Sequence, residues 1–390
     1  MAPQSADRLV GFGTSIFTEM SSLAVKHGAV NLGQGFPDFA APDFVKEAAV
    51  RHINEDRNQY ALSYGIPRLR SALADNWLRR YGQNVDPEGE ITVGCGATEM
   101  LIAAMLAVVN PGDEVIVFEP FYDAYLPDIQ LAGATPRVVS LRLPRWEWDP
   151  DELRAAFNSR TRAVVLNTPH NPTGKVFSRA ELEFLAQLCC EHDVVAISDE
   201  VYSEITFDDV RHVPIGTLPG MHERTITIDS MGKTFSVTGW KVGWAVAPPA
   251  LTRALRGVHQ FVTFTNSVPF QEALADTLVA ATSNDFYDSL RARYTARRDR
   301  LAETLDSVGL TTLPTQGAYF LLSDISTFGF ADDVAFCRHL CIGVGVAAIP
   351  PSAFYLDPRK APLLVRFCFA KRDETIEAAA ARLRRLRPLH

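Results

Sequence analysis

Residues 225–244 read Thr-Ile-Thr-Ile-Asp-Ser-Met-Gly-Lys-Thr-Phe-Ser-Val-Thr-Gly-Trp-Lys-Val-Gly-Trp. The β-branched run 225–228 predicts a buried strand, and the polar and glycine residues after it predict a turn. Lys233 lies in that turn between glycine and hydroxyl residues, with apolar runs on either side. Enclosure of a lysine disfavours its charged form, which lowers the pKa and frees the amine as a nucleophile. Schiff-base chemistry with a cofactor aldehyde needs such an amine.

The segment Gly232-Lys233-Thr234 also matches the end of the phosphate-loop pattern Gly-x-x-x-x-Gly-Lys-[Ser/Thr]. The first glycine of that pattern would be residue 227, which is Thr227. Because a β-branched residue does not suit a loop that wraps tightly around phosphate, a nucleotide site is disfavoured. An ordinary surface lysine remains the alternative for Lys233, and the rest of the chain has to decide.

Size and composition favour an intracellular protein that acts on small molecules. A chain of 390 residues exceeds one typical core, which predicts one large domain and a smaller one. The net charge of −8 disfavours nucleic acid and anionic membrane as partners. No stretch approaches a membrane span, and residues 1–8 lack the basic and apolar order of a signal peptide, so we expect a cytoplasmic protein.

The six cysteines have no C-x-x-C spacing, which favours reduced thiols over a disulfide framework or a zinc module. Cys337 and Cys341 are four residues apart in an amphipathic segment. We interpret them as small buried residues and expect no metal site.

Short apolar strands alternate with helices along most of the chain. The predicted strands are 91–93, 114–118, 137–140, 163–167, 194–198 and 225–228, and the helices between and around them include 43–54, 99–109, 122–132, 150–157 and 178–190. This alternation is typical of an α/β fold with a mostly parallel, doubly wound sheet, whose ligands bind beyond the carboxyl ends of the strands. Gly343-Val344-Gly345 lies in an apolar run that favours a further strand.

Chemically active residues follow five of these strands. They are Gly96 and Ala97, Glu119–Tyr122, Thr168–Gly174, Asp199–Tyr202, and Ser230 with Lys233. Because parallel strands end on one edge, these groups should converge. The glycine-rich turn after strand 91–93 leads into a helix, and the unpaired N–H groups of a helix N-terminus form an anion site.

In combination, these segments resemble the fold-type I pyridoxal-phosphate aminotransferases of class I and II. Within that family, they are most similar to the branch with the kynurenine, glutamine and methionine aminotransferases. The segments that carry the resemblance are Asn31–Phe39, Asn58–Tyr60, Glu119–Tyr122, Asn171–Gly174, Asp199–Tyr202 and Ser230–Lys241. The resemblance runs over nearly the whole chain.

The resemblance implies a homodimer whose large domain, residues 43–280, binds the cofactor. It also implies a small α+β domain built from residues 1–42 and 281–390, in which 285–308 reads as a long charged helix.

The resemblance assigns roles around the ring of pyridoxal 5′-phosphate. Lys233 would form the Schiff base with its aldehyde, and Asp199 would pair with the protonated pyridine nitrogen. Tyr202 and Asn171 would hydrogen-bond the phenolate oxygen, and Tyr122 would stack on the ring.

The phosphate group would lie on a helix N-terminus with further donors around it. The residues implied are the backbone of Cys95, Gly96 and Ala97, the side chains of Ser230 and Lys241, and the partner subunit's Tyr60.

Arg366 lies in the apolar run 363–368, where an unpaired charge would be costly, and the resemblance implies that it binds the substrate α-carboxylate. Asn171 and the backbone of Gly35 would lie beside it, and Phe17, Tyr64 and Phe264 are candidates for the side-chain pocket. Lys241 stands where aspartate aminotransferases carry an arginine, and no second arginine can be assigned to a distal carboxylate. An aromatic or uncharged amino acid is therefore preferred over aspartate.

The predicted reaction is ping-pong transfer of an amino group from such an amino acid to a 2-oxo acid. Three alternatives remain open. The same machinery serves cysteine-S-conjugate β-lyases, and related enzymes act on diaminopimelate or arginine-derived substrates. A regulatory domain that binds the cofactor without catalysis is disfavoured, because no DNA-binding segment precedes the fold and Arg366 is retained.

Overall fold

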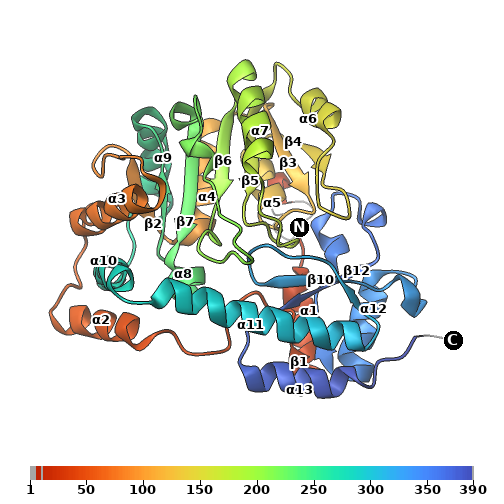
Figure 1. The fold of residues 1–390 in the computed structure, drawn as a ribbon. Helices are drawn as coiled ribbons and strands as arrows, with labels where there is room; N and C mark the ends of the chain where they lie inside the picture. Colours follow the sequence, from red (N-terminus) through yellow and green to blue (C-terminus); the bar gives the residue numbers. More distant parts are fainter. Residues whose placement is uncertain (1–5, 10–11, 389–390) are drawn as a thin grey trace, which may run out of the picture.

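The computed structural model describes residues 6–9 and 12–388, so the ends of the predicted small domain, residues 1–5 and 389–390, and residues 10–11 lie outside the described residues. In the described part of the chain, seven strands form one large sheet at the centre of the molecule (Figure 1). Its strands are β2 (Ile91–Gly94), β3 (Glu114–Glu119), β4 (Thr135–Ser140), β5 (Thr161–Asn167), β6 (Val195–Asp199), β7 (Thr225–Ser230) and β8 (Gly243–Val246). Their order is β2-β8-β7-β6-β5-β3-β4.

Five neighbouring strands of this sheet are parallel, and β8 runs antiparallel to both β2 and β7. The predicted doubly wound, mostly parallel sheet is thus confirmed. All six predicted strands are present, but β8 was missed. It has four residues and follows α8 (Met231–Thr234) and a short 3-10 helix, Thr238–Trp240, and a strand this short gives little alternation to detect.

Helices cover both faces of the sheet because successive strand residues point to opposite sides. Val115 and Val117 pack with one layer of helices, whereas Ile116 and Phe118 pack with the other. The first layer consists of α4 (Gly96–Val108), α5 (Tyr125–Leu131) and α9 (Pro249–Val262), and the second of α6 (Pro150–Ala156) and α7 (Arg179–His192).

A second body of structure lies beside the carboxyl edge of the sheet and combines both ends of the chain (Figure 1). An antiparallel sheet has the order β12-β10-β9, and β1 pairs in parallel with β11. The strands are β1 (Val30–Asn31), β9 (Thr311–Thr312), β10 (Phe320–Asp324), β11 (Val346–Ala347) and β12 (Leu364–Cys368). The helices around them are α1 (Ile16–His27), α11 (Phe286–Ser307), α12 (Asp333–His339) and α13 (Asp373–Leu383).

Three further helices lie at the β2 side of the large sheet, where α10 (Val268–Ser283) packs against both α2 (Asp43–Asn54) and α3 (Pro67–Tyr81). The expectation of a strand at Gly343–Gly345 was wrong. Residues Leu340–Val344 continue α12 as a wider helical turn, which ends at Gly345 with a φ of 90°. The strand β11 starts only at Val346.

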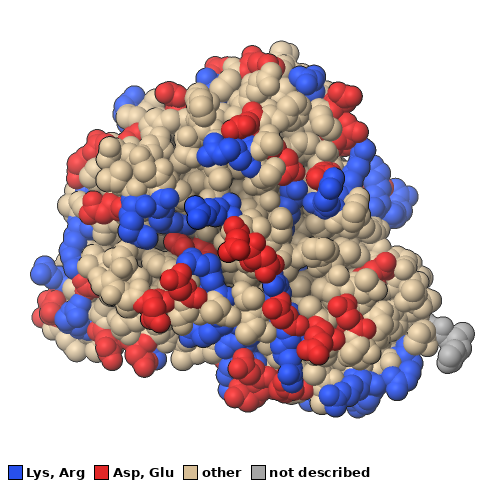
Figure 2. All heavy atoms as spheres, in the orientation of Figure 1, with Lys and Arg blue, Asp and Glu red and all other residues tan. Residues whose placement is uncertain are grey.

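The surface is mixed in charge. On the face shown in Figure 2, lysines and arginines are interspersed with aspartates and glutamates, and neither sign forms one continuous surface. Among the described residues, no helix combines the length and the apolar character that crossing a lipid bilayer requires.

Candidate active site

A cavity of about 290 Å³ opens where the strands of the large sheet end. It is lined by residues from both bodies of the structure. Twelve of the residues singled out in the sequence line it, namely Phe17, Gly35, Gly96, Ala97, Tyr122, Asn171, Asp199, Tyr202, Ser230, Lys233, Lys241 and Arg366. Gln34, Phe36, Thr98, Asn167 and Phe320 line it as well. The parallel sheet therefore brings together residues that are far apart in sequence.

Lys233 lies in α8 (Met231–Thr234), the single helical turn after β7. Its Nζ is 3.3 Å from the carbonyl oxygen of Gly35, to which it donates. The rings of Tyr202 and Tyr319 lie 5.6 and 5.7 Å from the same nitrogen. Burial of the ammonium lowers the pKa of Lys233 to about 8. The amine is therefore unprotonated far more often near neutral pH than an ordinary lysine, as a nucleophile or general base requires.

Asp199 is the last residue of β6 and is buried. The hydroxyl of Tyr125 donates to its Oδ2 at 2.7 Å, and the side-chain amide of Asn167 donates to its backbone carbonyl at 3.0 Å. Burial raises the pKa of Asp199 to about 6. A buried carboxylate of this kind gains stability from a cationic partner in the cavity.

The N-terminus of α4 meets the cavity at Gly96, which has a φ of +79°. A Cβ atom on Gly96 would lie 3.5 Å from the Nζ of Lys241, so the ammonium lies directly over the turn. The amides of residues 96–98 belong to the first helical turn, which leaves them without intrahelical acceptors. They form, with Lys241, a cradle for an anion.

The structure differs from the sequence expectation at Cys95. Its amide donates to the Oε2 of Glu99 at 3.0 Å, and its thiol faces the carbonyl of Thr265, so Cys95 does not line the cavity. Thr98 lines it instead. The helix α4 begins at Gly96, three residues before the predicted start, and Cys95 is its N-cap, so the free amides at the start of the helix begin with Gly96.

Arg366, in the middle of β12, is only 1% exposed. Its two terminal nitrogens donate to the side-chain oxygen of Asn171 at 2.8 Å and the carbonyl of Gly33 at 2.9 Å. Its Nε has no hydrogen-bond partner among the described residues. The rings of Phe17, Phe320 and Phe354 surround the guanidinium at 5.1, 4.2 and 5.3 Å. These two hydrogen bonds go to neutral oxygens, and a buried arginine bonded in this way is suited to bind the carboxylate of a ligand.

Three candidates lie away from this cavity. Tyr60 is 82% exposed and packs edge-on against Phe264, which is 42% exposed. Tyr64 lies between the guanidinium groups of Arg70 and Arg256, at 4.6 and 3.8 Å. None of the three lines the cavity of its own chain.

Sequence reasoning missed several residues that shape the site. Tyr125 and Asn167 support Asp199, and the hydroxyl of Tyr319 donates to the carbonyl of Gly35 at 2.6 Å. Asn167 ends strand β5, so the strand-end rule could have found it. Tyr125 and Tyr319 lie among apolar residues, and no local pattern distinguishes them from core aromatics.

Residues 27–383 match the family model described as aminotransferase class I and II. The chain belongs to this family. A methionine aminotransferase of Escherichia coli strain K12 is 45% identical over 386 residues, which cover 99% of both chains. A kynurenine–oxoglutarate transaminase of Dictyostelium discoideum is 41% identical and matches over 96% of this chain and 95% of its own.

The fold agrees with this family. The solved structure of an N-succinyldiaminopimelate aminotransferase from Mycobacterium tuberculosis superposes with a TM-score of 0.93 at 44% identity, and the match covers 98% of this chain and 99% of that one. The resemblance inferred from the sequence is therefore confirmed: this aminotransferase is a pyridoxal-phosphate-dependent enzyme of fold type I.

Proposed function

We propose that this aminotransferase holds pyridoxal 5′-phosphate in the cavity described above and transfers the amino group of an aromatic or uncharged L-amino acid to a 2-oxo acid. The observation that carries the substrate class is the set of cations in the cavity. Among the residues that line it, all in the described part of the chain, the cationic side chains are Lys233, Lys241 and Arg366.

The cavity fits the cofactor at three points. Gly96–Thr98 and Lys241 form an anion cradle for the phosphate, with Ser230 also on the wall. Asp199 offers a buried carboxylate for the protonated ring nitrogen. Lys233 offers an amine with a pKa of about 8 for the aldehyde. When bound, pyridoxal 5′-phosphate supplies the electron sink that acidifies the α-carbon of the amino acid.

The side chains around that carbon divide the work between them. With its amine free, Lys233 would accept the α-proton on its Nζ and would donate it again to complete the transfer of the amino group. Tyr202 and Asn171 would donate to the phenolate oxygen, and Asn171 can do so with its amide nitrogen because its oxygen accepts from Arg366. Tyr122, whose ring lies 5.7 Å from Tyr125, would cover the ring face.

Arg366 would bind the α-carboxylate next to Asn171 and the Gly35 backbone. Lys241 and Lys233 are engaged with the cofactor in this arrangement, so no cation of the cavity wall remains for a second substrate carboxylate. Burial of an unpaired carboxylate is unfavourable, which selects against aspartate. Phe17, Phe36 and Phe320 offer apolar contact to the side chain instead. The methionine and kynurenine enzymes among the relatives support this substrate class.

We also propose a homodimer, in which Tyr60 reaches the phosphate of the partner subunit's site. Tyr60 is 82% exposed, and Phe261, at the end of α9, is 91% exposed, so both offer large apolar surfaces to another chain. The division into residues 43–280 and residues 1–42 with 281–390 stays a proposal. So does the cytoplasmic location, which the six free cysteines support.

The test is an absorbance titration of the purified protein with single amino acids. We expect bound cofactor to colour the protein yellow, and methionine, phenylalanine, kynurenine or glutamine to bleach it. Aspartate should bleach it at least about tenfold more slowly, a difference of about 1.4 kcal/mol in barrier. A protein that takes up no cofactor would refute the proposed function, and preferential bleaching by aspartate would refute the substrate class. Pyruvate release from a β-chlorinated amino acid without an oxo-acid acceptor would reveal β-elimination, which the geometry does not favour over transfer.

A further inference from the structure

A buried pair of a carboxylate and an imidazole lies next to the anion cradle. Glu99, in the first turns of α4, is 9% exposed, and His259, on α9, is fully buried. The Oε1 of Glu99 lies 2.9 Å from the Nδ1 of His259, while its Oε2 accepts the amide of Cys95 at 3.0 Å. One carboxylate thus joins the turn at the start of the cradle to a second helix.

His259 also contacts the loop that precedes α3. Its Nε2 lies 2.8 Å from the carbonyl oxygen of Ser63, which can only accept a hydrogen bond. With a carboxylate at the other nitrogen, the ring is suited to donate from both sides, as the imidazolium does. Burial opposes that charge, but the hydrogen bond and the charge of Glu99, together with the Ser63 carbonyl, raise the pKa of His259.

The backbone at the end of β2 is shaped to admit the carboxylate. A Cβ atom on Gly94 would lie 2.1 Å from the Oε2 of Glu99, a distance that no side chain could occupy. The carbonyl of Gly94 accepts the side-chain amide of Asn266 at 2.7 Å. Glu99 is therefore built into the cradle and is not a surface carboxylate that happens to lie near it.

The negative charge of Glu99 lies close to the place where the cradle would bind an anion. A carboxylate one helical turn behind an anion cradle repels the anion, and in a buried place that repulsion is weakly screened. A protonated His259 cancels it. The pair can then fix the amide of Cys95 without opposing an anion at the amides of Gly96–Thr98.

We propose that Glu99 and His259 are positioning residues for the cofactor phosphate: Glu99 orients the first turn of α4, and His259 neutralises Glu99 and ties the turn to the loop that carries Tyr60. This inference rests on the proposed function, because it requires the cofactor phosphate in the cradle. It predicts an order of effects. Loss of His259 leaves the Glu99 carboxylate unpaired and close to the phosphate, which it repels. Loss of the charge on Glu99 removes that repulsion, and it also removes the attraction between Glu99 and His259.

The test compares the affinity of the full-length chain, freed of cofactor, for pyridoxal 5′-phosphate and for pyridoxal, which lacks the phosphate. In His259→Gln, we expect the dissociation constant of pyridoxal 5′-phosphate to rise about tenfold or more, as for a charge-assisted contact, and that of pyridoxal to change less than about twofold. Glu99→Gln should have a smaller effect. The double variant should bind the phosphate ester more tightly than His259→Gln alone.

The matched control is His222→Gln. His222 pairs with Glu90 at 2.8 Å beside the opposite end of β2, away from the cradle, so its loss should leave both affinities unchanged. Thermal unfolding of each cofactor-free variant shows whether it is folded. If His259→Gln does not fold, Glu99→Gln, the milder substitution, is used in its place.

Equal weakening of both ligands would show that the pair supports only the fold, and unchanged affinity for the phosphate ester would also overturn the proposal. A parent protein that binds neither ligand would instead refute the proposed function.

Discussion

The site has two halves that are held in opposite ways. On the rim of the large sheet, Asp199 ends β6 and Lys233 lies in the helical turn after β7, so both follow strands that are paired by backbone hydrogen bonds. In the loop of residues 33–36, the backbone itself faces the site and side chains hold it. Four consecutive carbonyls are bonded: Gly33 to Arg366, Gln34 and Phe36 to Lys371, and Gly35 to Tyr319 and Lys233.

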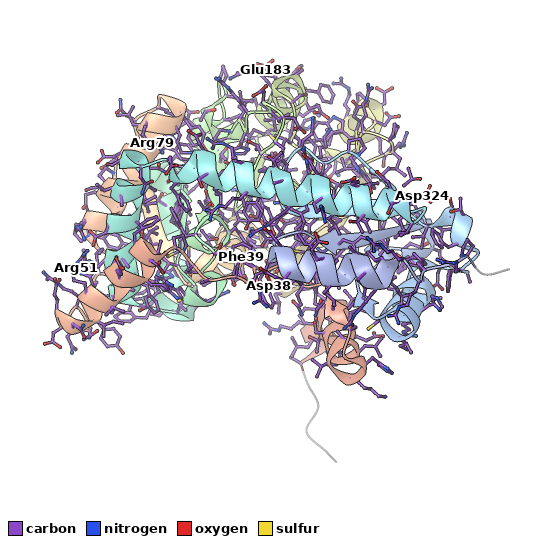
Figure 3. All side chains as sticks on the ribbon, turned by 60° about the horizontal axis from the view of Figure 1, so that its bottom comes forward. Asp38, Phe39, Arg51, Arg79, Glu183 and Asp324 are labelled. Atoms are coloured by element: carbon purple, nitrogen blue, oxygen red, sulfur yellow. The ribbon has the colours of Figure 1, made fainter. Side chains whose placement is uncertain are left out.

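The loop is anchored again where it leaves the site. Asp38 accepts the backbone amide of Arg372 and the hydroxyl of Thr375, both at 2.6 Å, and Phe39 lies 4.4 Å from the guanidinium of Arg297. Figure 3 shows Asp38 and Phe39 close to α11 and α13. The rim carries the residues that would hold the cofactor, so we expect substitutions there to lower kcat. The loop lies beside Arg366, which would bind the substrate, so we expect substitutions around the loop to raise KM.

The largest effect is expected at Lys233, which lies on the rim and also donates to the Gly35 carbonyl of the loop. Lys233→Ala removes the nucleophile and the base together, and we expect turnover to fall at least about 10⁴-fold. Single-turnover absorbance with a good substrate measures this. A variant that kept even a tenth of the parent rate would contradict the division of roles.

Arg366 is expected to come next, because it holds the loop and would bind the substrate. Arg366→Met keeps much of the volume but removes the charge, and kcat/KM for an amino acid should fall about 100- to 1,000-fold, as for loss of one partner of a buried ion pair. Steady-state kinetics measures this. Arg359→Met, at an arginine whose side chain is 89% exposed, is the control and should change nothing. A normal kcat/KM in Arg366→Met would exclude the arginine as the carboxylate ligand.

A substitution of Asp199 tests whether a rim residue that is needed for turnover lowers the stability of the cofactor-free protein. Its pKa of about 6 lies above the ordinary 3.8, so in the cofactor-free protein the ionised carboxylate destabilises the fold. The free energy of unfolding should therefore fall as pH rises from about 4 to 6. Above that pH, Asp199→Asn should be more stable than the parent by on the order of 3 kcal/mol, although its turnover should drop. Urea unfolding at pH 4 and pH 8 measures this, and equal stability at pH 8 would argue against the burial penalty.

The difference between the two halves also explains what the sequence could predict. Rim residues follow apolar strands in short motifs, so Asn171, Asp199 and Lys233 could be placed at one edge from strand order alone. The amide of Cys95 was expected in the cradle, but it donates to Glu99, four residues further along, and no pattern of residue types shows that this helix start is bonded in this way.

The loop side was mostly hidden. Arg366 could be identified because burial of an unpaired charge in an apolar strand is unfavourable, which indicates a binding role. Lys371 and Tyr319 hold the loop through contacts with residues more than 280 positions away, and no local pattern records such contacts. The same is true on the rim of Tyr125, which bonds Asp199 across 74 positions. The antiparallel strand β8 was missed for a related reason, since its pairing with β2 and β7 is decided by tertiary structure.

The smallest effect is expected at Lys371, which only holds the loop. It is 3% exposed, and its ammonium donates to the carbonyls of Gln34 at 3.2 Å and Phe36 at 2.8 Å. Lys371→Met removes both bonds at similar volume. The loop carbonyls can then turn to water, so Gly35 and Phe36 should lose their fixed place on the cavity wall. We expect KM for the amino acid to rise about tenfold, near the value of one hydrogen bond to a charged group, with kcat within about twofold of the parent.

Lys175→Met is the matched control, because Lys175 is also buried but pairs with Glu181 at 2.7 Å and donates to the Arg145 carbonyl at 3.3 Å. It should lower stability and leave KM unchanged. If both variants raised KM alike, the effect would come from a loosened fold. If Lys371→Met lowered kcat with KM unchanged, the loop would act on the chemical step, and the separation between a rim for chemistry and a loop for binding would fail.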